Sequence, residues 1–307
     1  MFNSKYSSIE QDKIFSEVPE LMVGFDTETT GLWKPPLRCP CPEHSQNGGL
    51  AVSLCPNDTP QLRELRKNDE SLHEPVTYGL VVYKNGKPFG RPSEWVAAPS
   101  SAALTAMSTV YPDKPLQKQP AIATHGWTPD MVTGSYSGRT VDIRSIDGNK
   151  RVVHTLHQPA VSRVAGVTRA AQELGEWQRR GAVIVGANVR GFDLAMLKHH
   201  YENLTKEPLF TSGLDLDTAP ILDVTRHHWA MAGRPMYQTG SRAGQPQYRA
   251  LSSSKLYKQT KDTLSDIYDV PEGNHSASED ARASVEVALR QIAANRGEFT
   301  PRPIRLG

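Results

Sequence analysis

The chain has few cysteines, few aromatic residues and almost no net charge. Of its 307 residues, 3 are cysteine and 7% are aromatic, and 35 basic residues nearly balance 33 acidic ones. The net charge of +2 is too small to indicate nucleic-acid binding by itself, although a local positive rim around an acidic site would have the same total. Residues 1–11 lack the apolar stretch of a signal peptide or membrane span, so we expect an intracellular protein. No internal repeat or heptad run is evident.

Acidic residues occur in three segments that lie far apart in the chain. Asp26 and Glu28 follow an apolar run and are two residues apart, so in a β-strand their side chains point to the same side. Asp193 follows a Gly-Phe pair, and Asp280 lies five residues after His275. Carboxylates that come close together need cations to neutralise them, and hard oxygen ligands suit Mg²⁺ or Mn²⁺. These segments predict a centre with two metal ions.

Each segment also has a purely structural explanation. An Asp-x-Glu after a strand often caps the next turn or helix. Asp193 and Asp280 are each favourable as acids in the first turn of a helix. Three such coincidences with matching order and spacing are improbable together, and we therefore favour the catalytic interpretation.

The motifs resemble those of the DEDDh (DnaQ-like) 3′–5′ exonucleases, a family that includes the proofreading exonuclease subunits of bacterial DNA polymerase III, RNase T and oligoribonuclease. The family's Asp-x-Glu is matched by Asp26 and Glu28 within Phe-Asp-Thr-Glu-Thr-Thr-Gly-Leu, and its His-x-Ala-x-x-Asp-Ala begins at His275. The family's Asn-x-x-Phe-Asp is matched at Asp193, but Asn188 lies one residue further away, with Gly191 as the extra residue. A fourth segment, residues 124–128, is similar to the family's His-Gly-Ile-Thr, with Trp in place of Ile.

The resemblance implies a metal-dependent removal of nucleoside 5′-monophosphates from DNA 3′ ends. It implies that Asp26, Glu28, Asp193 and Asp280 bind two Mg²⁺ or Mn²⁺ ions, with Asp26 bridging them, and that His275 is the general base. Histidine suits that role because it titrates near neutral pH. Contacts with the terminal nucleotide are expected from Thr29, Gly31, Leu32, His125 and Asn188.

Two alternatives remain open at this stage. The motifs do not separate a DNA substrate from an RNA substrate such as that of oligoribonuclease, because no pocket for a 2′-hydroxyl group can be identified. A non-catalytic, polymerase-associated accessory subunit is the alternative outside enzymes, although the complete set of acids and His275 favours an enzyme. A polymerase or another replication protein is a candidate partner, and a stand-alone bacterial or phage-encoded member would work in the cytoplasm, of the host in the phage case.

The order of patterns predicts an α/β fold. Strands are expected at residues 21–26, 76–83 and 94–98, the last two separated by an Asn-Gly hairpin turn, and then at 182–187 and 220–224. Helices are expected at 162–180, from about 192, near 254–268 and at 277–292. The resemblance implies a ribonuclease-H-like mixed sheet of five strands, three antiparallel and two parallel, flanked by helices.

The predicted exonuclease domain spans residues 21–294, between an N-terminal extension (1–20) and a flexible tail (295–307). It contains three insertions: a Cys-rich segment (33–75), a hairpin (134–159) and a loop with basic and aromatic residues (234–249) that has the composition of a nucleic-acid contact. The first insertion holds Cys39, Cys41, His44 and Cys55, the ligand set of a structural zinc site. The alternative is three unpaired thiols in a loop, since a disulfide is not expected in a reducing compartment.

Overall fold

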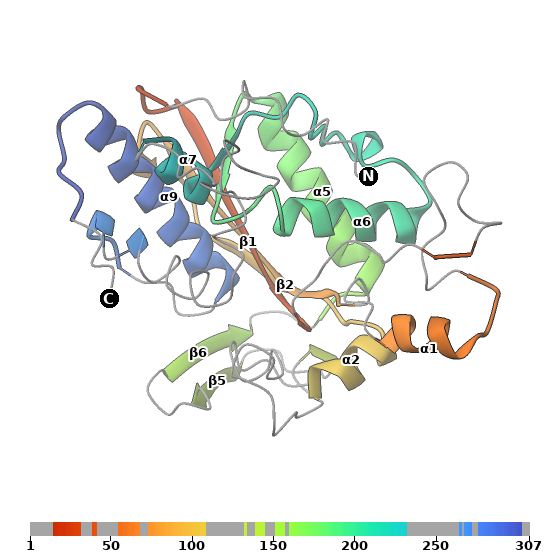
Figure 1. Ribbon diagram of the computed structural model, residues 1–307. Coiled ribbons are helices and arrows are strands. Elements are labelled where there is room, and N and C mark those ends of the chain that lie inside the picture. The colour runs from red at the N-terminus through yellow and green to blue at the C-terminus, as the bar shows by residue number, and fades with distance from the viewer. Residues whose placement is uncertain are drawn as a thin grey trace.

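A mixed β-sheet with helices on both faces forms the centre of the protein, as the computed structural model shows (Figure 1). The structure describes residues 15–31, 39–41, 55–67, 73–108, 132–133, 139–144, 151–156, 160–231, 264–265, 267–271 and 276–302. The strands of the main sheet are β1 (Leu21–Thr29), β2 (Pro75–Lys84), β3 (Lys87–Pro88), β4 (Ser93–Val96), β7 (Val183–Gly186) and β8 (Ile221–Asp223). The helices are α1 (Pro60–Lys67), α2 (Ser101–Ser108), α5 (Arg163–Arg179), α6 (Asp193–Thr205), the 3-10 helix η7 (Leu209–Ser212), α7 (Val224–Met231) and α9 (Ala277–Asn295). The predicted α/β class is confirmed.

The main sheet has six strands, so the prediction of five was wrong. Its order is β3-β2-β1-β7-β8, and β4 also pairs with β2. β1 and β2 are antiparallel, whereas β1–β7 and β7–β8 are parallel. The extra strand is β3, which pairs with β2 directly after the Asn85-Gly86 turn. β3 falls between the expected turn and the strand expected at 94–98, which corresponds to β4. Gly90, with φ +79°, and Pro92, which has no N–H to donate, separate β3 from β4.

Two apolar layers cover the two faces of the sheet. Because side chains alternate along β1, Val23 and Phe25 belong to the layer beneath α5 and α6, while Met22 belongs to the layer beneath α7 and α9. Figure 1 shows α5 and α6 on one side of β1 and α7 and α9 on the other. β7, which is buried along its whole length, lies in the middle of this arrangement, as expected for a parallel strand covered on both faces.

The strands β5 (Arg139–Arg144) and β6 (Arg151–Leu156) form a separate antiparallel hairpin, at the place where the sequence predicts one. The predicted basic and aromatic loop at 234–249 lies outside the described residues. No described helix has the length and apolar character needed to cross a membrane.

The chain termini pack on the core in their described parts. Phe15 and Val18 contact the layer beneath α9, and the Phe15 N–H donates to Nε2 of His227 at 3.2 Å. After α9, the Phe299 ring lies 6.3 Å from that of Tyr268, and the Arg302 N–H donates to a backbone carbonyl at 2.9 Å. The described part of the tail therefore packs on the core as far as residue 302, although its composition predicts a flexible tail from residue 295.

His200, a buried residue of α6, makes the stability of the fold depend on pH. Its Nε2 donates to the carbonyl oxygen of His73 at 2.9 Å, and burial, with a smaller effect of His199, lowers the pKa of its imidazole to about 4. The unfolded chain binds this proton near pH 6.5 and the folded chain does not, so the stability contribution is present above pH 6.5 and is lost as the pH falls towards 4.

We predict that His200→Gln flattens the acid limb of the stability curve. Glutamine keeps a donor for the His73 carbonyl but does not titrate, so the variant should lose part of the dependence, up to about 1.4 kcal/mol per pH unit. Urea unfolding of both proteins at pH 7.5, 5.5 and 4.5 measures the difference. Parallel stability curves for the two proteins would contradict the assignment.

Candidate metal centre

Strand β1 places two carboxylates on the face of the sheet that α9 covers. Gly24, Asp26 and Glu28 alternate with Phe25 and Thr27, so the first three share one face. The strand continues through Thr29 because β2 pairs with it residue by residue to Glu28, where the register shifts. The strand therefore ends at Thr29, three residues later than predicted, and includes both carboxylates. Regular sheet geometry fixes the direction of their side chains.

Two glycines let the N-terminal part of α9 lie directly on the sheet. Gly79 of β2 is the cross-strand partner of Asp26, and a Cβ atom at Gly79 would lie 2.2 Å from the backbone between Ala277 and Ser278. A Cβ at Gly24 would lie 2.7 Å from the carbonyl oxygen of Ala281. Both contacts are possible only without a side chain. They bring the first turn of α9, with Asp280, next to Asp26.

Glu94 of β4 holds the start of α9 in this position. Its Oε2 accepts a hydrogen bond from the Ser276 hydroxyl at 2.7 Å and another from the Ser278 N–H at 3.0 Å. A carboxylate is a favourable acceptor at a helix N-terminus, where backbone N–H groups have no partner within the helix. Glu94 thus aligns the segment that carries Asp280.

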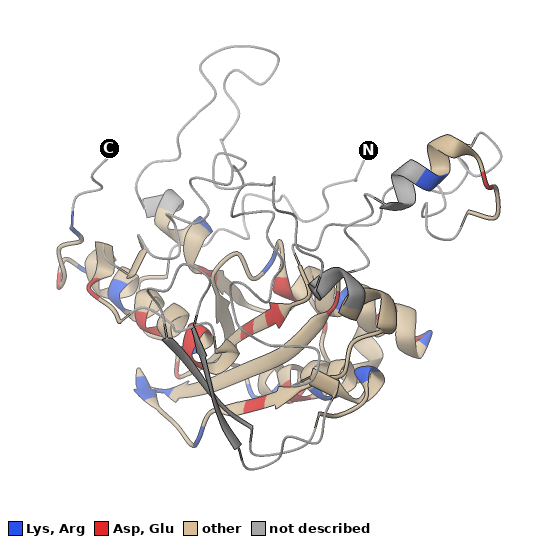
Figure 2. Cartoon of the chain, turned by 90° about the horizontal axis from the view of Figure 1, so that it is seen from below, with Lys and Arg blue, Asp and Glu red and all other residues tan. Residues whose placement is uncertain are grey.

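Asp26, Glu28 and Asp280 form a compact acidic cluster. Carboxylate oxygens of the three residues all lie within 4.8 Å of one another, and the residues are only 7%, 8% and 1% exposed. At this separation each ionised pair repels by roughly 3 kcal/mol or more with an effective dielectric constant of about 20. Divalent cations remove this repulsion, and oxygen-only ligand sets suit Mg²⁺ or Mn²⁺. In Figure 2, acidic segments lie on strands and helices near the middle of the molecule.

Asp193 reaches the same region from the opposite face of the sheet. It is the first residue of α6 and is 2% exposed, and its Oδ1 accepts from both the N–H and the hydroxyl group of Thr27, at 3.1 and 2.6 Å. Thr27 stands between Asp26 and Glu28, so Asp193 lies beside the acidic cluster without belonging to it.

The loop before Asp193 accommodates Gly191, the extra residue between Asn188 and Asp193. Asn188 has φ +56°, and its carbonyl oxygen accepts from the N–H groups of Gly191 and Phe192 at 3.1 and 3.0 Å. The extra residue is thus absorbed in a turn before α6 begins. A Cβ at Gly191 would lie 2.8 Å from the Asn188 side-chain oxygen, so the extra position suits glycine.

Asp223, the last residue of β8, holds that turn. Its carboxylate accepts from the backbone N–H groups of Asn188 and Arg190, at 3.2 and 3.4 Å, and from two N–H groups at the start of α7. Burial raises the pKa of this carboxyl group, and the Arg226 side chain together with the N–H donors opposes the rise. Asp223 therefore connects the ends of β7 and β8 to the position of Asp193.

The predicted substrate contacts are described only in part. The Thr29 hydroxyl donates to the Gly31 carbonyl at 2.6 Å and so closes the turn after β1, while the space beside Gly31 is filled by the His73 ring. Leu32 and His125 lie outside the described residues, as does His275, the predicted general base.

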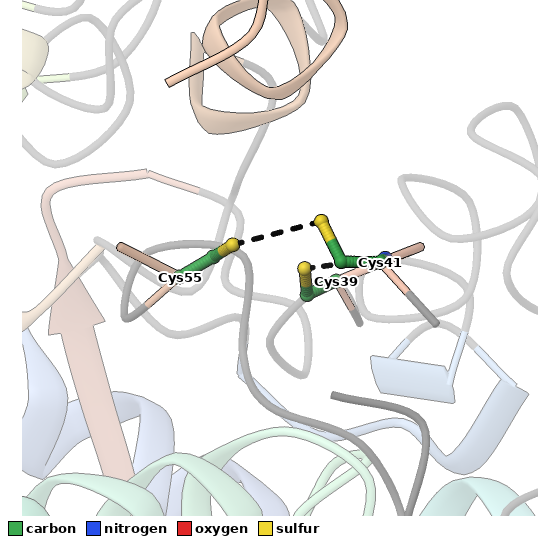
Figure 3. Close-up of side chains that lie close together, drawn as sticks. All are labelled: Cys39, Cys41 and Cys55. Carbon is green, nitrogen blue, oxygen red and sulfur yellow. Dashed lines mark hydrogen bonds between the residues drawn. The ribbon is translucent and has the colours of Figure 1, made fainter. Parts of the chain in front are cut away.

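The cysteines of the first insertion also come together. The sulfur atoms of Cys39, Cys41 and Cys55 all lie within 4.8 Å of one another (Figure 3). Burial raises the pKa of the Cys39 thiol to about 11. His44, the fourth residue of the predicted zinc site, lies outside the described residues.

Three contributors were missed from the sequence: Gly79, Glu94 and Asp223. Gly79 interrupts the apolar strand 75–84, and a glycine inside a strand signals close approach of another backbone. Asp223 follows a short apolar strand in the same way as Asp26 does. Glu94 carried no local signal, because its partners lie more than 180 residues away in the chain.

No protein-family model matches the chain, and no curated protein sequence matches it.

We predict that Gly79→Ala separates Asp280 from Asp26. The added Cβ has no room against the α9 backbone, so the helix start must shift and binding of Mn²⁺ should weaken at least about tenfold, more than stability loss alone would explain. Gly90→Ala is the control: with φ +79° it strains the backbone and so costs stability, but no atom lies within 4 Å of its Cβ position. Calorimetric titration with Mn²⁺ measures the effect, and equal affinity in both variants would contradict it.

Proposed function

We propose that the protein is a metal-dependent 3′–5′ exonuclease of the DEDDh type with a ribonuclease-H-like fold, acting on DNA. The observation that carries the proposal is the convergence of Asp26, Glu28 and Asp280 within 4.8 Å, with Asp193 bound to the intervening Thr27. The same four acids make up the family's motifs. The mixed sheet, with β1 between an antiparallel and a parallel neighbour, agrees with the fold that the resemblance implies.

The donor set fits the metals that such a reaction needs. Asp26, Glu28 and Asp280 would hold one ion, with Asp26 shared, and Asp193 would contribute to a second. When bound, Mg²⁺ or Mn²⁺ offsets the negative charge that develops on phosphodiester oxygens during attack by water. Glu28 Oε1 and Asp280 Oδ1 are both shielded from solvent, so the carboxylates present a dry, preorganised ligand face.

The protein's own residues supply position and proton transfer. Glu94 and Gly79 fix the α9 start that carries Asp280, and the Asp223 turn fixes Asp193. His275 directly precedes Ser276 in the chain, and Ser276 is anchored to Glu94. In the proposal, His275 takes the proton of the attacking water, and the turn from Thr29 to Gly31 contacts the terminal nucleotide.

The substrate is tested by direct comparison. End-labelled single-stranded DNA, duplex DNA and RNA of one sequence are incubated with the protein and Mg²⁺, with and without chelator. The expected result is stepwise shortening of DNA from its 3′ end with release of 5′-monophosphates, abolished by chelator. Faster digestion of RNA would assign the oligoribonuclease-like alternative, and no digestion of any substrate would contradict the proposal.

We predict that Asp26→Asn removes almost all nuclease activity and leaves the fold intact. The substitution deletes the shared ligand and also relieves carboxylate repulsion, so the metal-free variant should unfold at the same or a higher temperature than wild type. Asp217→Asn, at an exposed position, is the matched control and should keep full activity. Thermal melts and the labelled-DNA assay are made on the same samples. If Asp26→Asn digests DNA at the wild-type rate, Asp26 is not a ligand of the catalytic metal ions.

We predict that His275→Ala slows single-turnover cleavage by roughly 10²–10⁴-fold, the usual contribution of a general base. Because His275 is not a proposed ligand, the Mg²⁺ concentration that gives half-maximal rate should stay nearly the same. His199→Ala, which changes a histidine of α6 outside the site, should keep the wild-type rate. An unchanged rate in His275→Ala would require another base.

A further inference from the structure

The cysteine cluster is assembled from two separate stretches of the first insertion. Cys39 and Cys41 approach from one stretch, and Cys55 approaches from the segment that leads into α1, as Figure 3 shows. Cys41 and Cys55 Sγ are 3.9 Å apart, well beyond the roughly 2.05 Å of a disulfide bond. Three sulfurs that face a common point from both sides are arranged as ligands of one ion.

Two N–H groups donate to the sulfur atoms. The backbone N–H of Cys41 donates to Cys39 Sγ at 3.4 Å, and the Asn57 side-chain amide donates to Cys41 Sγ at 3.4 Å. A neutral thiol is a weak acceptor, whereas hydrogen bonds to an ionised group are roughly twice as strong as neutral ones. Metal-bound sulfur atoms can still accept such donors, so these two contacts are compatible with a metal site.

Apolar packing around the cluster is small. Among the described residues, the buried group consists of Cys39, Cys55 and Leu62, with Cys41 against it. Within the part of the chain that the structure describes, one leucine and three thiols provide little apolar surface to hold the two stretches together. A bound ion would add to this packing, because structural zinc contributes directly to folding.

The ends of the insertion are clamped together, but the clamp is distant in sequence from the cysteines. The Thr30 N–H donates to the Glu74 carbonyl at 2.8 Å, and the Glu74 N–H donates to the Thr30 hydroxyl at 3.0 Å. Glu74 also forms an ion pair with Arg163 of α5. This contact closes the base of the insertion without involving the cysteines.

We propose that Cys39, Cys41 and Cys55 bind one structural Zn²⁺ ion as thiolates. Thiolate ligands favour Zn²⁺ over the hard cations of the acidic cluster, and a structural zinc is four-coordinate, so one further donor completes the site. The two centres share no ligand. The zinc site is therefore independent of the nuclease centre and of its proposed function.

The first test uses the wild-type chain purified without chelator. Elemental analysis should find about one zinc per chain, and X-ray absorption at the zinc edge should show three sulfur neighbours at about 2.3 Å with one lighter donor. The Asp26→Asn variant should keep the same zinc content, which separates this site from the acidic cluster. Zinc with only oxygen and nitrogen neighbours, iron or copper in its place, or metal-free protein with a disulfide between two of these cysteines would each overturn the proposal.

The second test compares Cys41→Ser with Asp58→Asn. Cys41→Ser should reduce bound zinc to well under half an ion per chain and open the insertion to limited proteolysis. Asp58→Asn alters a neighbouring exposed residue that forms an ion pair with Arg63, and should keep zinc and protease resistance. Full zinc content in Cys41→Ser would overturn the proposal, and the absorption spectrum of the wild type decides the matter if that variant does not fold.

Discussion

The acidic cluster depends on one backbone contact, in which the start of α9 lies directly on β1 and β2. Ordinary side chains between a helix and a sheet keep the two backbones apart. At Gly24 and Gly79 the helix backbone comes to the distance at which a single Cβ would collide. Only this close approach lets a carboxylate of the helix, Asp280, lie within 4.8 Å of two carboxylates of the strand. Glu94 then holds the start of the helix by accepting hydrogen bonds from Ser276 and Ser278.

This arrangement is electrostatically unfavourable in the metal-free protein. Three buried acids that repel one another by several kcal/mol make a poor structural core, and a fold selected for stability alone would not bring them together. The cost becomes useful once cations are bound, because the same geometry then holds them without rearrangement. Further contacts hold Asp193 beside this cluster from the other face of the sheet. Thr27 binds its carboxylate, and Asp223 binds the loop that precedes it.

Much of the fold was predictable because the signals are local. The apolar run at β7, the Asn85-Gly86 turn and the amphipathic pattern of α5 each determine a strand, a turn or a helix from neighbouring residues. The strand count was wrong because β3 has only two residues, Lys87 and Pro88, and carries no strand pattern of its own; it forms by pairing with β2 after the turn. The segment after α9 likewise packs on the core through Phe299 and Tyr268, although its composition resembles that of a tail. In both cases tertiary contacts decide where the local sequence gives no signal.

The residues alone indicate which carboxylates can form the site, because strand periodicity places Asp26 and Glu28 on one face and the motif spacing singles out Asp193 and Asp280. They also indicate which cysteines can meet, since all three fall in one insertion. That Asp280 joins the first pair while Asp193 binds Thr27 from the opposite face is visible only in the folded protein. The reason is physical: the separation of side chains from distant segments is set by helix and sheet packing, and by glycines whose purpose appears only when another backbone lies against them.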